Sequence, residues 1–111
     1  EGLQAHAKRV GDQMLDGLRT LMDRHEIIGD VRGSGMFLGV ELVRDRSTLE
    51  PAAEEAAFVA NRMRERRVLL GTDGPYHNVV KIRPPMPFTA EDGRLLLEEF
   101  DRALELVRRM G

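Results

Sequence analysis

The spacing of apolar residues changes from segment to segment along this chain, and that change limits the folds it can adopt. From residue 3 to about 25, apolar residues recur every three or four positions, which draws one stripe on a helix. Residues 27–42 and 68–83 instead hold short β-branched runs, with glycines that would be costly inside a helix. Helical spacing returns over residues 51–66 and from residue 89 onward. The predicted order is helix, two strands, helix, two strands, helix.

This order predicts an α+β fold in which three helices pack on one face of a small, mostly antiparallel sheet of about four strands. Within two of the strands, apolar and non-apolar residues alternate, so each strand has a buried and an uncovered side. The predicted core side carries Met36, Leu38, Val40, Leu42, Val80 and Ile82. The opposite side carries Phe37, Gly39, Glu41, Lys81 and Arg83.

Local signals predict where the second and third helices begin. Pro51 stands where a first helical turn tolerates proline, and Thr89 with Asp92 three residues later resembles a capping box. The expected buried stripes are Leu3, Ala7, Val10, Met14, Leu18 and Leu21 in the first helix, Ala53, Ala56, Ala60 and Met63 in the second, and Leu96, Phe100, Ala103 and Val107 in the third.

Length and charge narrow the classes of protein to consider. The 111 residues suit one domain with one core. The 17 basic and 19 acidic residues are mixed along the chain, which argues against a nucleic-acid footprint. No uncharged run is long enough to span a bilayer, so no membrane partner is expected. The absence of cysteine excludes disulfides and thiolate sites and is compatible with a cytoplasmic location.

The first residues lack a start methionine and the pattern of a signal peptide, and the chain opens within the predicted first helix. We therefore expect residues 1–111 to be a single domain excised from a longer protein.

Residues capable of chemistry are scattered. His6, His25 and His77 lie far apart without ligand spacing, which favours surface or helix-cap roles over metal binding. Ser34 lacks the context of a catalytic serine and is interpreted as a turn residue. The two lysines, Lys8 and Lys81, do not have the setting of a desolvated Schiff-base lysine.

The uncovered side of the sheet is the main candidate site, and it has two interpretations. In one, Glu41 forms a cross-strand ion pair with Lys81 or Arg83 on a solvated surface, which would contribute a few tenths of a kcal/mol. In the other, this side docks onto another domain, and Arg83 offers its two parallel N–H donors to a ligand carboxylate.

Three segments, taken together and in order, resemble the small domain of class III aminotransferases: GDVRGSGMFLGVELVRD, GTDGPYHNVVKIRPPMPF and TAEDGRLLLEEFDRAL. The specific parts are the R-G-x-G-x-x-x-G-x-E run from Arg32 to Glu41 and the K-I-R-P-P run from Lys81 to Pro85. The second segment is most similar to the branch that holds alanine-glyoxylate-type aminotransferases and ethanolamine-phosphate phospho-lyases.

The resemblance implies that the chain is the carboxy-terminal small domain of a fold-type I, pyridoxal-phosphate (PLP) homodimer, which transfers an amino group to a 2-oxo acid. The large domain of the same chain would supply the Schiff-base lysine and the phosphate site, so the isolated segment is expected to be inactive. One position carries over: Arg83 corresponds to the arginine that pairs with the substrate carboxylate. Two alternatives stay open, namely an ammonia-releasing phospho-lyase, for which lysine at position 83 would be suited, and a freestanding ferredoxin-like module.

Overall fold

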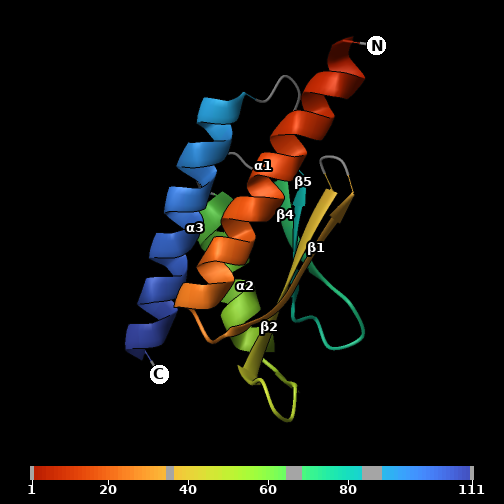
Figure 1. The fold of residues 1–111 in the computed structure, drawn as a ribbon. Coiled ribbons are helices and arrows are strands. Elements are labelled where there is room, and N and C mark those ends of the chain that lie inside the picture. The colour runs from red at the N-terminus through yellow and green to blue at the C-terminus, as the bar shows by residue number, and fades with distance from the viewer. Residues whose placement is uncertain (1, 35–36, 65–68, 84–88, 111) are drawn as a thin grey trace.

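The computed structural model describes residues 2–34, 37–64, 69–83 and 89–110. Within these residues three helices alternate with strands in the predicted order (Figure 1). The elements are α1 (Gly2–Arg24), β1 (Ile28–Ser34), β2 (Phe37–Asp45), β3 (Glu50–Pro51), α2 (Ala53–Arg64), β4 (Leu69–Asp73), β5 (Val79–Arg83) and α3 (Ala90–Met110).

The strands form an antiparallel sheet in the spatial order β1-β2-β5-β4, and the two-residue β3 pairs with β2 beyond this path. The two central strands are therefore β2 and β5, which lie far apart in the chain. Their register places Leu38 opposite Ile82 and Val40 opposite Val80. The α+β class, the antiparallel sheet and the element order are confirmed, and β3 is an addition that the sequence did not predict.

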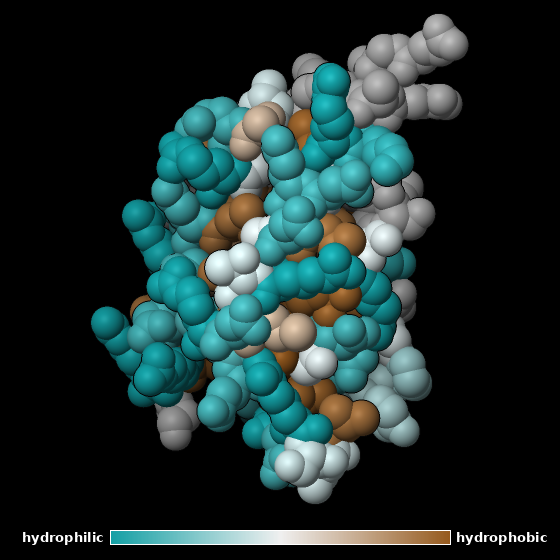
Figure 2. All heavy atoms as spheres, in the orientation of Figure 1, coloured by the Kyte–Doolittle hydropathy of each residue, from teal (hydrophilic) through white to brown (hydrophobic). Residues whose placement is uncertain are grey.

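The hydrophobic core lies between the sheet and the helices, which cover one face of it (Figure 1). The predicted core side is confirmed where the side chains are described, since Leu38, Val40, Leu42, Val80 and Ile82 are all buried. Met36 lies outside the described residues. The outward side of the helical layer is mostly hydrophilic, with hydrophobic residues showing between the polar ones (Figure 2). No helix in the described ranges combines the length and apolarity needed to cross a bilayer.

Helix α1 packs its stripe against the sheet and against α3. Val10, Met14, Leu18 and Leu21 are buried as predicted, whereas the side chains of Leu3 and Ala7 lie outside the described part. The guanidinium of Arg46, in the turn after β2, donates to the carbonyl oxygens of Met22 at 2.6 Å and Glu26 at 3.1 Å. The bond to Met22 satisfies an acceptor that the last turn of α1 leaves without an intrahelical partner, and the bond to Glu26 ties down the chain just after the helix.

The prediction for the start of α2 was wrong by two residues. Pro51 lies in β3 opposite Val43, and α2 begins at Ala53. The reason is that the N–H of the intervening Ala52 donates to the carbonyl of Leu42 at 3.0 Å, which continues the strand pairing up to the helix. Ala53 is accordingly only half-buried. The buried residues of this helix are Ala56, Val59, Ala60 and Met63.

The start of α3 matches the prediction closely. The backbone N–H of Asp92 donates to the hydroxyl of Thr89 at 3.0 Å, and the N–H of Thr89 donates to the carboxylate of Asp92 at 3.0 Å. This reciprocal pair satisfies donors that the first helical turn would otherwise leave open. The predicted inner face of Leu96, Phe100, Ala103 and Val107 is buried, and Leu104 joins it.

Candidate functional site

The candidate site lies on the face of the sheet that the helices do not cover, called here the outer face. Residues directly opposite one another in paired strands project to the same side, so the register defines which residues share it. In β5 the alternation is clear, because Lys81 and Arg83 are exposed whereas Val80 and Ile82 are fully buried. The described outer-face residues are Asp30, Arg32, Gly39, Glu41, Gly71, Val79, Lys81 and Arg83. The predicted sides of both strands are thus confirmed where the side chains are described, and the side chain of Phe37 lies outside the described part.

Arg32, in the edge strand β1, forms two ion pairs on the outer face. Its guanidinium lies 2.8 Å from the carboxylate of Asp30 and 3.2 Å from that of Glu41. A cross-strand pair between glutamate and arginine therefore exists between β1 and β2. All three side chains are partly exposed, so the net stabilisation from these pairs is small.

Arg83 lies away from this cluster. Glu41 stands opposite Val79, and Arg83 follows Val79 by four positions in the strand, a distance of about 13 Å. Because the carboxylate of Glu41 also contacts Arg32, a cross-strand pair with Arg83 is not supported by the register. Arg83 is the last residue of β5, at the level of Leu69 in the edge strand β4. The residues that follow it, 84–88, lie outside the described part.

A cross-strand row in which cations alternate with glycines crosses the middle of the outer face. Arg32 is opposite Gly39, Gly39 is opposite Lys81, and Lys81 is opposite Gly71, so Lys81 has glycine on both neighbouring strands. A shallow depression of about 310 Å³ lies here, bordered by Arg32, Gly33, Gly39, Gly74, Val79 and Lys81. Gly39 was predicted on this face from the alternation within its strand, whereas Gly71 was not, because no local pattern aligned β4 with β5.

The loop between β4 and β5 forms one side of this depression and is anchored in the core. Asn78 is buried and donates its side-chain amide to the carbonyl of Leu42 at 2.9 Å, while the N–H of Leu42 donates to the carbonyl of Asn78 at 2.8 Å. Gly74 has φ +88° and His77 has φ +53°, the left-handed region in which a non-glycine residue is strained. The ring of Tyr76 is exposed at the tip.

Other arginines near the sheet are used within the domain. Arg44 places two guanidinium nitrogens against the carboxylate of Glu55 in α2, at 3.1 and 3.2 Å. Burial alone would raise the pKa of Glu55, but the hydrogen bonds from Arg44 and from its own backbone lower this pKa overall. Arg44 thus joins β2 to α2 and has the planar geometry of a structural ion pair.

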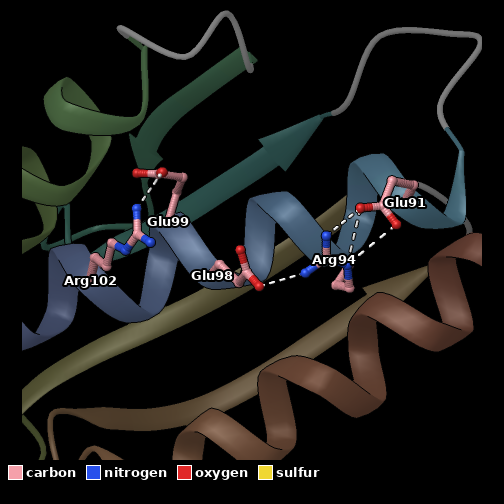
Figure 3. Close-up of polar contacts among 5 residues, drawn as sticks. All are labelled: Glu91, Arg94, Glu98, Glu99 and Arg102. Carbon is pink, nitrogen blue, oxygen red and sulfur yellow. Dashed lines mark hydrogen bonds and ion pairs between the residues drawn. The ribbon is translucent and has the colours of Figure 1, made fainter.

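The solvent side of α3 carries charged pairs of its own (Figure 3). Arg94 contacts Glu91 one turn earlier and Glu98 one turn later, and Arg102 lies 3.1 Å from Glu99. The hydrogen bond from Arg94 lowers the pKa of Glu91. These spacings of three and four are those of a solvated helix face, so this surface is not a candidate ligand site.

The histidines do not form a metal site within the described ranges, where no group of three potential ligands occurs. His25 follows α1 but is buried rather than at the surface, and its Nε2 lies 2.6 Å from a carboxylate oxygen of Asp101 in α3. His77 is exposed in the β4–β5 loop, and the side chains of His6 and Ser34 lie outside the described part.

Neither lysine has a setting suited to a Schiff base. Lys8 is on the exposed side of α1, where its ammonium lies 3.4 Å from Asp12 and 78% of its side chain is accessible. Lys81 is exposed on β5. A Schiff-base lysine has to be buried in an apolar pocket to be desolvated, and neither of these exposed side chains is. The described residues of this chain therefore do not fit a PLP site by themselves.

Comparison with known proteins connects this fold to one family. The family model described as "Aminotransferase class-III" matches residues 1–104. An Arabidopsis thaliana protein, alanine-glyoxylate aminotransferase 2 homolog 2, mitochondrial, is 44% identical over 94% of this chain and 22% of its own length.

Solved structures agree with this match. A phospholyase from Arthrobacter in complex with phosphoethanolamine superposes with a TM-score of 0.85 and 33% identity, over 94% of this chain and 25% of the other. A PLP-bound amine transaminase from an uncultivated Pseudomonas species superposes with a TM-score of 0.79 and 30% identity. This match covers 94% of this chain and 23% of the transaminase. The chain thus spans about a quarter of the length of the relatives it matches.

Proposed function

The chain belongs to the class III aminotransferase family, and from this premise we propose that it is the carboxy-terminal small domain of a PLP-dependent aminotransferase. The whole protein would transfer an amino group from an amino acid or amine to a 2-oxo acid. The family resemblance inferred from the sequence is confirmed. The match to this family favours the aminotransferase over the alternative of a freestanding ferredoxin-like module.

The observation that carries the proposal is the position of Arg83. It is exposed, it ends a central strand, and it lies on the sheet face that the domain's own helices leave uncovered. Ligand sites occur preferentially where such a face meets another domain. We propose that the large domain of the same chain covers the outer face, and that Arg83 reaches the cleft between the two domains.

The chemistry of a guanidinium suits the role of a substrate anchor. Its planar fork can donate two parallel hydrogen bonds to both oxygens of a carboxylate, which fixes orientation as well as position. Orientation matters because the alignment of the substituents at the α-carbon decides which bond is broken. In this proposal Arg83 therefore holds the carboxylate of the incoming amino or keto acid and points the reacting group toward the cofactor.

The cofactor would be held by the large domain, since neither lysine of this chain has a suitable environment. PLP supplies the electron sink that stabilises a carbanion at the substrate carbon. The 111-residue chain alone should neither bind PLP nor transaminate. When PLP and then borohydride are added to it, mass spectrometry should find no stoichiometric adduct on Lys8 or Lys81. A stoichiometric adduct on either lysine would contradict the proposal.

A phospho-lyase is the second candidate, favoured by the similarity to the Arthrobacter phospholyase. The two activities release different products. We expect the full-length enzyme, incubated with alanine and glyoxylate, to form pyruvate and glycine, and to release no phosphate or ammonia from phosphoethanolamine. Phosphate and ammonia release without amino transfer would make the protein a lyase. Arginine rather than lysine at position 83 supports the transaminase, because its fork matches the carboxylate of an amino or keto acid, and phosphoethanolamine has no carboxylate.

We also propose that the full-length protein is a homodimer, as the family resemblance implies. The cytoplasmic location expected from the sequence stays a prediction, and the Arabidopsis thaliana relative is named mitochondrial.

A further inference from the structure

Strand β5 presents two cations on the outer face. Lys81 and Arg83 are two positions apart, so their side chains leave the same side of the strand at points separated by about 6–7 Å. Both side chains are exposed. One guanidinium fork is sufficient for one carboxylate. A second cation at this spacing matches a ligand that carries a second anionic group.

The glycines beside Lys81 give its side chain room to move. A Cβ built on Gly71 would meet no atom within 4 Å, and one built on Gly39 would meet only a methyl group of Val79 at 3.4 Å. The four-carbon stem of Lys81 can therefore lie over either neighbouring strand and carry its ammonium toward the level of Arg83. The depression of about 310 Å³ beside it leaves space for part of a ligand.

The charges around this position also bear on what can bind. Asp30 and Glu41 both contact Arg32, which lies in the same cross-strand row as Lys81 with Gly39 between them. Lys81 and Arg83 each interact with other groups of the chain. A bound anion would exchange such contacts for contacts with the ligand, as exposed ion pairs allow at small cost.

We propose that Lys81 is a specificity-determining residue which, together with Arg83, selects amino compounds with two anionic groups over those with one. The inference rests on the proposed function, because Arg83 takes the first carboxylate. Lys81 takes the second group, a carboxylate or a phosphate. A flexible ammonium suits this task, since its point charge accepts anions at several distances where the arginine fork demands one geometry.

The test compares substrates that differ by one anionic group, using the full-length PLP-loaded enzyme. Aspartate is compared with alanine for a second carboxylate, and O-phosphoserine with serine for a phosphate. In Lys81→Gln, the ratio of kcat/KM for the dianionic substrate over its partner should fall at least tenfold for one pair or both, and the affected pair identifies the anion. Lys8→Gln, which removes the other lysine of these 111 residues, should leave both ratios within twofold.

A binding measurement separates this inference from the proposed function. Succinate and butyrate have the same chain length and differ by one carboxylate, and calorimetry gives their Kd values without turnover. Lys81→Gln should raise the Kd of succinate at least fivefold and the Kd of butyrate less than twofold. A wild-type enzyme that does not prefer succinate overturns the inference, as do ratios and affinities that Lys81→Gln leaves unchanged. If Lys81→Gln lowers kcat/KM equally for all substrates and also lowers the Tm, Lys81 has a structural role and the inference is overturned. If no amino acid donates its amino group, the proposed function fails, while the succinate result still decides the role of Lys81.

Discussion

Replacing Arg83 with lysine in the full-length enzyme should lower kcat/KM for amino acid substrates by about ten- to a thousandfold. Lysine keeps the positive charge but loses the fork, so two charge-assisted hydrogen bonds to the carboxylate become one flexible contact. The KM should rise and the amine should be less well oriented, which lowers kcat as well. PLP binding should survive, because the cofactor is held elsewhere in the proposed enzyme. Steady-state kinetics with several amino acids and the cofactor absorbance measure both quantities.

Arg44→Lys provides a matched control for this experiment. It removes the same fork geometry from a pair with Glu55 inside the domain, at 3.1 and 3.2 Å. We expect it to lower the Tm only slightly and to leave the kinetics close to wild type, because a solvent-exposed ion pair contributes little to stability. If Arg83→Lys behaves in the same way, with kcat/KM near wild type for every carboxylate substrate, Arg83 is a structural residue and the proposed anchor is wrong.

Truncating Phe100 to alanine should lower the free energy of unfolding by about 3–5 kcal/mol. Phe100 is the largest fully buried side chain among the described residues, and it extends from α3 into the cluster formed by the three helices and the sheet. Its removal leaves a cavity that close-packed neighbours can fill only in part. A loss of this size is a large share of the 5–15 kcal/mol typical of a whole domain. Urea denaturation of the 111-residue chain measures it as a lower midpoint at unchanged slope.

The same helix offers the control for this prediction. Leu95 in α3 is 46% exposed, so Leu95→Ala removes an apolar side chain without opening a cavity in the core. Its effect should stay within about 0.5 kcal/mol. A cost below about 1 kcal/mol for Phe100→Ala would mean that α3 does not pack as described, and the arrangement of the core would need revision.

Features that depend on near neighbours in the chain could be read from the sequence. The stripe from Val10 to Leu21, the capping pair of Thr89 and Asp92, and the alternation that separates Ile82 from Arg83 all follow from residues within four positions of one another. Helix and strand periods are local properties of the backbone, so such patterns predict which side of an element is buried. The error at Pro51 shows the limit, since a hydrogen bond between Ala52 and Leu42 shifted the helix start.

The candidate site was predictable only in part, because some of its contacts join residues that are distant in the chain. That Lys81 and Arg83 share the uncovered side follows from period two, and Arg83 was singled out by its place before two prolines and by family resemblance. The ion pair of Arg32 with Glu41 was not identified, because a glutamate can meet any cation on a neighbouring strand and only the register selects one.

Contacts between segments distant in the chain were settled by the tertiary structure. It places β5 between β2 and β4, which gives Lys81 glycine on both sides, and it pairs buried His25 with Asp101, 76 positions later. No local pattern encodes these pairings. They form because burying the apolar sides of the strands and helices together is far more favourable than any single polar contact, and the polar groups must then find partners wherever that packing leaves them.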